Sequence, residues 1–206
     1  MKNTLKLYLV TDREQSLGRN LEEVVSEAVK GGVSIVQLRE KHASTGEFLD
    51  LALRLREILK PYDVPLIIND RIDIALAVDS DGVHLGQDDM PADVARKIIG
   101  DKKILGVSAA TVKEAKKAQI DGADYIGSGA VFPTSTKDDA DSVSKEELID
   151  IVGSIDIPVV AIGGITLENA SLLKDTGISG FSVVSAIMSA DNPKDASSKL
   201  KEIYFS

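Results

Sequence analysis

Charged side chains that could bind phosphate and a cation follow several short apolar segments of the chain. Arg39 and Lys41 come directly after the apolar segment 34–38. Asp70 and Asp89 follow the next two apolar segments. One or two carboxylates together with a substrate phosphate are the usual ligands of Mg²⁺. Two cations at alternate positions of an extended segment face the same side and suit a polyanion such as diphosphate.

Each of these side chains also has a plainer explanation. Asp70, Asp89 and the adjacent Asp88 could cap the helices that follow them, as short acidic residues often do. Asp88 could also exchange roles with Asp89 as the cation ligand. The two cations could instead form surface ion pairs with Glu40 or Asp12. The residue types alone leave these alternatives open.

Two further segments, near the C-terminus, have the composition of a phosphate site. Gly163 and Gly164 follow the apolar segment 157–162, and Ser185 follows the segment 180–184. Glycine lets backbone N–H groups approach an anion closely, and the N-terminus of a helix favours negative charge. Ordinary tight turns between a strand and a helix could also have these residues. The occurrence of both segments after the last two strands favours phosphate binding.

The elements that must position these residues alternate regularly along the chain. Short runs rich in Val, Ile and Leu predict buried parallel strands, and amphipathic stretches predict helices. The predicted strands are residues 5–10, 34–38, 64–68, 82–85, 103–107, 124–129, 157–162 and 180–184. The predicted helices are residues 20–30, 45–60, 71–78 and 166–175, with others beginning near 91, 111, 144 and 192.

Eight such units of about 25 residues each match the lower size range of a (β/α)8 TIM barrel. An open doubly wound α/β sheet shares the alternation. The regular succession of units without a break favours the closed barrel, in a single domain over residues 1–206. Catalytic groups of such barrels lie at the C-terminal ends of the strands, and phosphate binds after the last two strands. We therefore expect the charged residues and the glycine segment to meet at one rim.

Composition excludes several classes of function. The net charge of −9 argues against a nucleic-acid surface, which needs clustered Lys and Arg. No apolar run approaches the roughly 20 residues that span a bilayer. The chain has no cysteine, which excludes disulfides and thiolate chemistry and is typical of a reducing, cytoplasmic location. We expect His42 to be solvated and His84 to be a packed, hydrogen-bonded residue, so an activated nucleophile is unsupported.

The segments at the predicted strand ends resemble the thiamine phosphate synthase family over nearly the whole chain. Individually they are ordinary barrel turns, but their order, each at its own strand end, is highly specific. The matching segments are residues 7–12, 37–41, 68–70, 82–89, 106–108, 133–137 and 162–166.

The resemblance implies a transferase that joins an aminopyrimidine-methyl diphosphate to a thiazole phosphate, or to its carboxylated form, by a dissociative, Mg²⁺-assisted substitution. It implies Mg²⁺ at Asp70 and Asp89, and catalytic roles for Arg39, Lys41, Ser108 and Lys137. The pyrimidine diphosphate would contact Gln37, Arg39, Lys41, Asn69, Ser108 and Lys137. The thiazole phosphate would contact Thr134, Ser135, Thr136, Gly164, Val184 and Ser185. The expected partners are these small molecules, with no nucleic acid or membrane, and homo-oligomer formation stays open.

Two positions depart from the family pattern. Val184 stands where many relatives have isoleucine, and Ala110 stands where relatives often have histidine. In the related family of thiazole tautomerases a histidine in that region is expected to take part in the reaction, so Ala110 counts against tautomerase activity. The remaining alternatives are another thiazole- or phosphosugar-handling barrel, and a catalytically silent barrel that binds thiamine precursors and regulates a partner.

Overall fold

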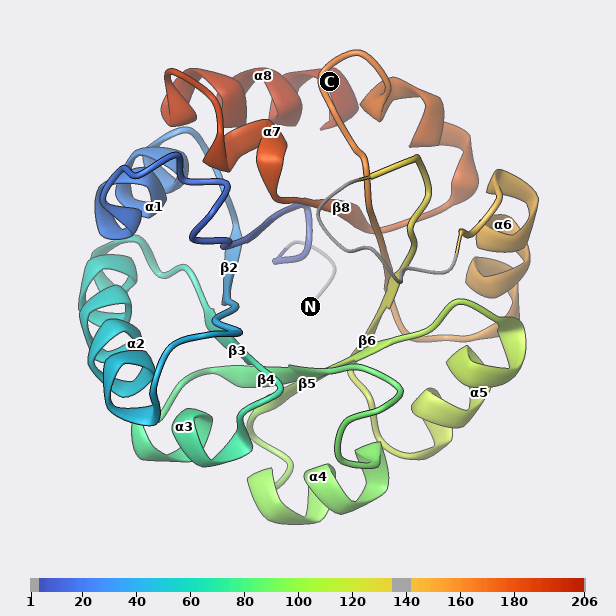
Figure 1. Ribbon diagram of the computed structural model, residues 1–206. Helices are drawn as coiled ribbons and strands as arrows, with labels where there is room; N and C mark the ends of the chain where they lie inside the picture. Colours follow the sequence, from blue (N-terminus) through green and yellow to red (C-terminus); the bar gives the residue numbers. More distant parts are fainter. Residues whose placement is uncertain (1–3, 135–141, 206) are drawn as a thin grey trace.

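The computed structural model describes residues 4–134 and 142–205, and within them eight parallel strands close into a barrel. Each strand pairs with the next one along the chain, and β8 pairs with β1. The helices surround the barrel on the outside (Figure 1). The predicted TIM barrel is therefore confirmed, and the open sheet is excluded.

The strands are short and regularly spaced. They are β1 (Leu7–Val10), β2 (Ile35–Leu38), β3 (Leu66–Asn69), β4 (Gly82–Leu85), β5 (Ile104–Ser108), β6 (Tyr125–Ser128), β7 (Val159–Ile162) and β8 (Gly180–Val183). The helices are α1 (Leu21–Lys30), α2 (Thr45–Leu59), η1 (Lys60–Tyr62), α3 (Ile72–Ala77), α4 (Ala92–Ile99), α5 (Val112–Ile120), α6 (Lys145–Ser154), η2 (Ala170–Thr176), α7 (Ser185–Met188) and α8 (Pro193–Phe205). Within the described residues, no helix is both long enough and apolar enough to cross a membrane.

Side-chain caps define where several helices begin. Capping boxes begin the two helices predicted near residues 111 and 144, because Thr111 caps α5 and Ser144 caps α6. A third box, formed by Ser44 and Glu47, begins α2. Such a cap satisfies N–H groups that the first helical turn leaves unpaired, and typically contributes about 1 kcal/mol. The loop between a strand end and the following helix therefore has a defined length.

The region after β7 differs from the prediction, because residues 166–169 are not helical and a 3₁₀ helix, η2, follows them. Thr166 donates its N–H to Asn169 Oδ1 at 2.8 Å, and Asn169 Nδ2 donates to the carbonyl of Gly164 at 2.8 Å. These side-chain bonds compete with helical bonds and hold a turn. After β8 a short extra helix, α7, lies between the strand end and α8 (Figure 1), a feature the sequence did not predict.

Apolar side chains fill both the barrel interior and the layer between the barrel and the helices. The interior cluster includes Tyr8, Ile35, Ile67, Tyr125 and Val160, all buried. The outer cluster comprises the opposite faces of the strands and the inner faces of the helices. Because the interior is packed, ligands must bind at its rim, where the loops leave the strands.

Candidate active site at the rim of the barrel

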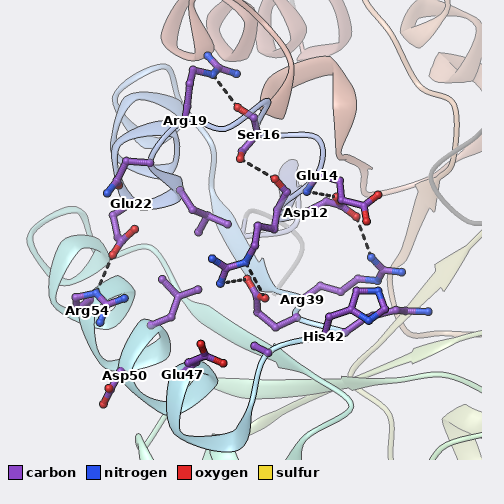
Figure 2. A pocket seen from close by; sticks show the side chains of 17 residues that line it. Asp12, Glu14, Ser16, Arg19, Glu22, Arg39, His42, Glu47, Asp50 and Arg54 are labelled. Atoms are coloured by element: carbon purple, nitrogen blue, oxygen red, sulfur yellow. Dashed lines mark hydrogen bonds and ion pairs between the residues drawn. The ribbon is translucent and has the colours of Figure 1, made fainter.

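Arg39 leaves the end of β2 beside a cavity of about 1100 Å³ between the β1–α1 and β2–α2 loops. Its Nη1 donates to Asp12 Oδ2 at 3.1 Å, and its backbone N–H donates to the Oγ1 of the buried Thr11 at 3.1 Å. Figure 2 shows Arg39 and Asp12 directed at one another. The proposed ion pair with Asp12 is therefore present, whereas Glu40 pairs with Arg13 at 3.0 Å.

Lys41 is exposed and lines the same cavity. The positive charges of Lys41 and Arg39 both lower the pKa of Asp70. The two cations are therefore close enough to act on one carboxyl group. His42 also lines this cavity and is exposed, as expected.

The carboxyl groups of Asp70 and Asp89 lie within hydrogen-bonding reach of each other, although they follow different strands. Partial burial is the main cause that raises the pKa of Asp70, and the neighbouring Asp89 raises it further, to about 6. Asp70 has a left-handed backbone, with φ of 60°, and donates its N–H to the carbonyl of His84 at 2.9 Å. The β3–α3 turn thus directs this carboxyl group toward the β4–α4 loop.

Neither acid caps a helix. The N-cap position of α3 is Arg71 and that of α4 is Pro91, and neither makes a side-chain cap bond. Asp89 Oδ2 instead accepts the N–H of Gly86 at 2.6 Å, a bond that closes the β4–α4 loop. The capping explanation for Asp70, Asp88 and Asp89 is therefore wrong, and Asp89 is the one that meets Asp70.

The carboxylate pair suits a hard cation that also binds a substrate. Among residues 4–134 and 142–205, no group of three or more His, Cys, Asp or Glu side chains could enclose a metal ion. Two carboxylates are too few to surround Mg²⁺, but they match the usual arrangement in which substrate phosphate and water complete its shell. Asp70 and Asp89 fit that donor set.

Gln37, Asn69 and Ser108 lie at the C-terminal ends of β2, β3 and β5, on the same rim. Gln37 is only 4% exposed and donates from Nε2 to the Tyr8 hydroxyl at 2.9 Å. Asn69 ends β3 and pairs in register with His84. Ser108 ends β5, and its Oγ lies 3.0 Å from His84 Nε2. His84 is thus hydrogen-bonded and packed, as expected, and burial lowers its pKa to about 4.

The glycine segment after β7 packs against the segment that follows β6. Gly163 and Gly164 have positive φ angles of 100° and 63°, which favour glycine. A Cβ atom on Gly164 would overlap the carbonyl oxygen of Pro133 and lie 2.7 Å from that of Phe132. Phe132 in turn donates its N–H to the Gly163 carbonyl at 3.1 Å. Thr134, two residues beyond Phe132, is therefore held near the glycine turn.

The end of β8 leads directly into the short helix α7. Val184 precedes its first turn and accepts hydrogen bonds from the N–H groups of Ile187 and Met188, at 3.2 and 2.8 Å. Ser185, the first residue of α7, is exposed. Because β7 and β8 are neighbours in the barrel, Gly164 and Ser185 lie on adjacent strand ends. The predicted residues Ser135, Thr136 and Lys137 lie outside the described part of the chain.

Comparison with known proteins identifies the family. The model of the thiamine monophosphate synthase family matches residues 7–187. The chain belongs to the thiamine monophosphate synthase family. It is 65% identical over 196 residues to a thiamine-phosphate synthase of Methanobrevibacter smithii, which covers 95% of this chain and 93% of that protein. It is 58% identical to one of Ruminiclostridium cellulolyticum, over 96% of this chain and 94% of that protein. The family predicted from the strand-end segments is confirmed.

A solved structure from the same family has nearly the same backbone. The thiamine phosphate pyrophosphorylase of Pyrococcus furiosus is 43% identical, with a TM-score of 0.91 over 98% of this chain and 96% of that one. A 3-hexulose-6-phosphate synthase, with a TM-score of 0.74 at 17% identity, shares the fold alone. The family therefore rests on sequence and structure together, while the roles of individual residues stay predictions.

Two residues beneath the rim, Tyr8 and Tyr125, were not among the predicted site residues. Their hydroxyl oxygens lie 2.8 Å apart, and that of Tyr125 lies 2.9 Å from His84 Nδ1. A signal for this arrangement was present in the glycines of the neighbouring strands, because strand glycines often mark a close approach. A Cβ atom on Gly106 would overlap Tyr125 and lie 2.5 Å from His84 Nδ1, and one on Gly127 would lie 3.0 Å from the His84 ring.

Proposed function

We propose that this chain is a thiamine-phosphate synthase, a transferase of thiamine biosynthesis. It would join an aminopyrimidine-methyl diphosphate to a thiazole phosphate, or to its carboxylated form, and release diphosphate. Family membership supports the reaction. The observation that carries the assignment of the site is the meeting of Asp70 and Asp89 next to Arg39 and Lys41. Two cations facing two carboxylates suit a diphosphate bound together with a divalent metal ion.

Mg²⁺ is the cofactor of this proposal, with Asp70 and Asp89 as its ligands from the protein. The neighbouring Asp89 raises the pKa of Asp70, so the pair holds a proton more readily than two separate carboxyl groups would. A divalent cation removes that repulsion. When bound, Mg²⁺ neutralises part of the charge on the departing diphosphate.

The proposed roles of the cations follow from where charge develops. The bond from the pyrimidine methylene carbon to the diphosphate oxygen breaks, and its electron pair leaves with the diphosphate. Arg39 and Lys41, with Lys137, bind that group, and Asn69 and Ser108 hydrogen-bond to the same substrate. Positive groups fixed before the reaction stabilise this charge without reorganisation, which is often the largest contribution to catalysis.

The second substrate needs to be held in line rather than activated. The lone pair of the thiazole nitrogen forms the new C–N bond, so no side chain has to remove a proton. We place the thiazole phosphate at the adjacent ends of β7 and β8, against Thr134, Ser135, Thr136, Gly164, Val184 and Ser185. Anchoring this phosphate orients the nitrogen, and such orientation can supply several kcal/mol of the barrier reduction.

The proposal includes small-molecule partners, with neither nucleic acid nor membrane, and a cytoplasmic location. The acidic net charge of −9 supports the absence of a nucleic-acid partner, and the lack of cysteine suits a reducing compartment.

A coupled assay for thiamine phosphate tests the proposal. Purified protein should form thiamine phosphate from both substrates with Mg²⁺, and chelation of Mg²⁺ should stop the reaction. Lys41→Ala should lower the rate about 10²- to 10³-fold, the scale of removing one charge-stabilising group. The control is Lys97→Ala on α4, which removes an exposed cation paired with Asp93.

Two results would contradict this assignment. Binding of the thiazole phosphate by calorimetry without any product would indicate a regulatory barrel. Interconversion of thiazole phosphate isomers without condensation would indicate a tautomerase, despite Ala110.

A further inference from the structure

A continuous chain of hydrogen bonds crosses the barrel interior beneath the site, from Gln37 on β2 to Ser108 on β5. Gln37 Nε2 lies 2.9 Å from the Tyr8 hydroxyl, which lies 2.8 Å from the Tyr125 hydroxyl. The Tyr125 hydroxyl lies 2.9 Å from His84 Nδ1, and His84 Nε2 lies 3.0 Å from Ser108 Oγ. The two ends of this chain are residues that we place against the pyrimidine substrate.

The two tyrosines at the centre of this chain are shielded from water. Tyr8 is 2% exposed and Tyr125 is fully buried, and their rings meet edge to face with centroids 5.9 Å apart. Burial raises the pKa of both tyrosines and lowers that of His84 to about 4. Two phenols and one neutral imidazole therefore share the hydrogens of the chain.

If every phenol and imidazole hydrogen is used within the chain, a count of those hydrogens permits two directions. Each phenol has one hydrogen to donate, and a neutral imidazole has one N–H and one acceptor nitrogen. In the first direction Gln37 donates to Tyr8, and Tyr8 donates to Tyr125. Tyr125 then donates to His84 Nδ1, and the N–H at His84 Nε2 donates to Ser108. In the opposite direction, every donor and acceptor is exchanged.

The direction determines what the two ends present to a ligand. In the first direction the Gln37 amide nitrogen donates to Tyr8, so the amide oxygen is the atom that faces the substrate. The Ser108 hydroxyl accepts from His84, so its own hydrogen is available to the substrate. In the opposite direction Gln37 offers its NH₂ group, and Ser108 spends its hydrogen on His84. The structure has Gln37 Nε2 on Tyr8, which corresponds to the first direction.

We propose that Tyr8, Tyr125 and His84 are positioning residues that fix Gln37 as a hydrogen-bond acceptor and Ser108 as a donor, and thereby select an aminopyrimidine over its oxo analogue. This inference rests on the proposed function. An exocyclic amino group donates to the Gln37 oxygen, whereas a carbonyl in its place would face that oxygen. At the other end, the Ser108 hydroxyl donates to an anionic diphosphate oxygen. The first direction therefore complements both ends of the substrate, and the opposite direction complements neither.

Nitrogen NMR of histidine tests the direction without any turnover. The chain has two histidines, so His42→Gln leaves His84 alone in a ¹⁵N–¹H correlation spectrum. The spectrum is recorded from about pH 6 to pH 8, the range in which a free histidine titrates. The expected result is a neutral ring with its hydrogen on Nε2 throughout that range. A ring protonated on Nδ1 alone, or a charged ring in that range, would overturn the proposal.

Substrate discrimination tests the consequence. The kcat/KM of the wild type for the 4-amino pyrimidine diphosphate should exceed that for the 4-oxo analogue by about 10⁴-fold, as in sites built to bind a substrate N–H. Tyr8→Phe removes the acceptor that holds the Gln37 nitrogen, so the ratio should fall by about tenfold or more, the worth of one hydrogen bond. Tyr62→Phe is the control, because this tyrosine is 44% exposed in η1.

The outcomes separate the two proposals. If the wild type does not turn over the amino substrate, the proposed function fails and the selectivity fails with it, while the NMR result still decides the direction of the chain. If the wild type is active but Tyr8→Phe, folded by circular dichroism, keeps the full ratio, the positioning role is overturned and the proposed function stands. A collapsed ratio with an Nε2–H tautomer supports the proposal.

Discussion

The guanidinium of Arg39 donates to the carboxylate of Asp12 at 3.1 Å, and the two side chains are only 18% and 15% exposed. Asp12 is itself anchored, because its Oδ1 accepts the N–H groups of Glu14 and Gln15 at 3.0 and 3.1 Å. The planar guanidinium has further N–H groups that Asp12 does not use. Arg39 is thus oriented by one carboxylate, and its remaining N–H groups stay able to bind an anion.

Replacement of Arg39 should therefore damage catalysis without damaging the fold. Arg39→Ala should lower the turnover rate about 10²- to 10³-fold, because one group that stabilises the departing diphosphate is lost. Arg39→Lys should recover only part of it, since lysine lacks the planar fork. The control is Arg56→Ala, which breaks an ion pair with the exposed Asp79 on the outside of the barrel. Near-normal turnover of purified Arg39→Ala would remove the diphosphate-binding role.

The carboxylate pair makes a separate prediction about magnesium. Asp70→Ala should raise the Mg²⁺ concentration needed for half-maximal rate by at least about tenfold, equivalent to about 1.4 kcal/mol of binding free energy. Asp88→Ala provides the matched control, because Asp88 lies beside Asp89 and caps no helix. The measurement is a magnesium titration of the initial rate. An unchanged titration for Asp70→Ala would refute the ligand assignment, and a shift for Asp88→Ala alone would transfer the role.

The raised pKa of Asp70 predicts a pH dependence of Mg²⁺ binding. In the folded protein the pKa of the Asp70 carboxyl group is about 6, whereas the ordinary pKa of aspartate is 3.8. A proton and a metal ion compete for the same oxygens, so Mg²⁺ affinity should rise as the pH increases through 6. Without Mg²⁺, the free energy of unfolding contributed by Asp70 should fall between pH 3.8 and about 6, because the unfolded chain ionises first.

Calorimetric Mg²⁺ titrations at several pH values check this prediction. Asp89→Asn should lower the pKa of Asp70, because it removes the neighbouring negative charge. The range from about pH 5 to pH 7 brackets the raised pKa of Asp70. A Mg²⁺ affinity that does not change over this range would contradict the coupling of the two carboxyl groups. So would carboxyl NMR that shows the same Asp70 pKa in Asp89→Asn as in the wild type.

The strand ends could be predicted because they depend on local rules. Gln37, Arg39 and Lys41 occupy alternate positions, and alternate positions of an extended segment share a side. The parallel barrel then places successive strand ends on the same rim. The relation of Asp70 to Asp89 could not be decided in this way, because capping and metal binding use the same residue type. The backbone geometry of the turns after β3 and β4 distinguishes them.

Contacts across the barrel were beyond local rules. Tyr8 and Tyr125 are separated by 117 positions along the chain, and they meet because β1 and β6 place both side chains in the interior. That meeting depends on the stagger of the strands around the barrel rather than on the pattern within either strand. The non-helical turn at residues 166–169 was missed for a different reason: Thr166 and Asn169 bond locally, which a periodicity of apolar residues does not reveal.

Glycine replacements measure how closely the interior is packed around this contact. Gly106→Ala would place a Cβ atom against Tyr125 and 2.5 Å from His84 Nδ1, so both rings must shift. Overpacking of this kind typically lowers the free energy of unfolding by about 1–3 kcal/mol. Gly153→Ala is the matched control, because Gly153 lies within α6 and an added Cβ atom there meets no other atom within 4 Å. Alanine at that helical position should stabilise the protein by about 0.5–1 kcal/mol.

Denaturant unfolding of the two alanine variants should thus give changes of opposite sign. Gly106→Ala should also lower activity, since the shift of Tyr125 and His84 disturbs the hydrogen bonds that reach Gln37 and Ser108. An unfolding midpoint for Gly106→Ala equal to that of the wild type would mean that the rings of Tyr125 and His84 move aside without a cost in stability. In that case the barrel interior would be too loose to hold Gln37 and Ser108 in one orientation.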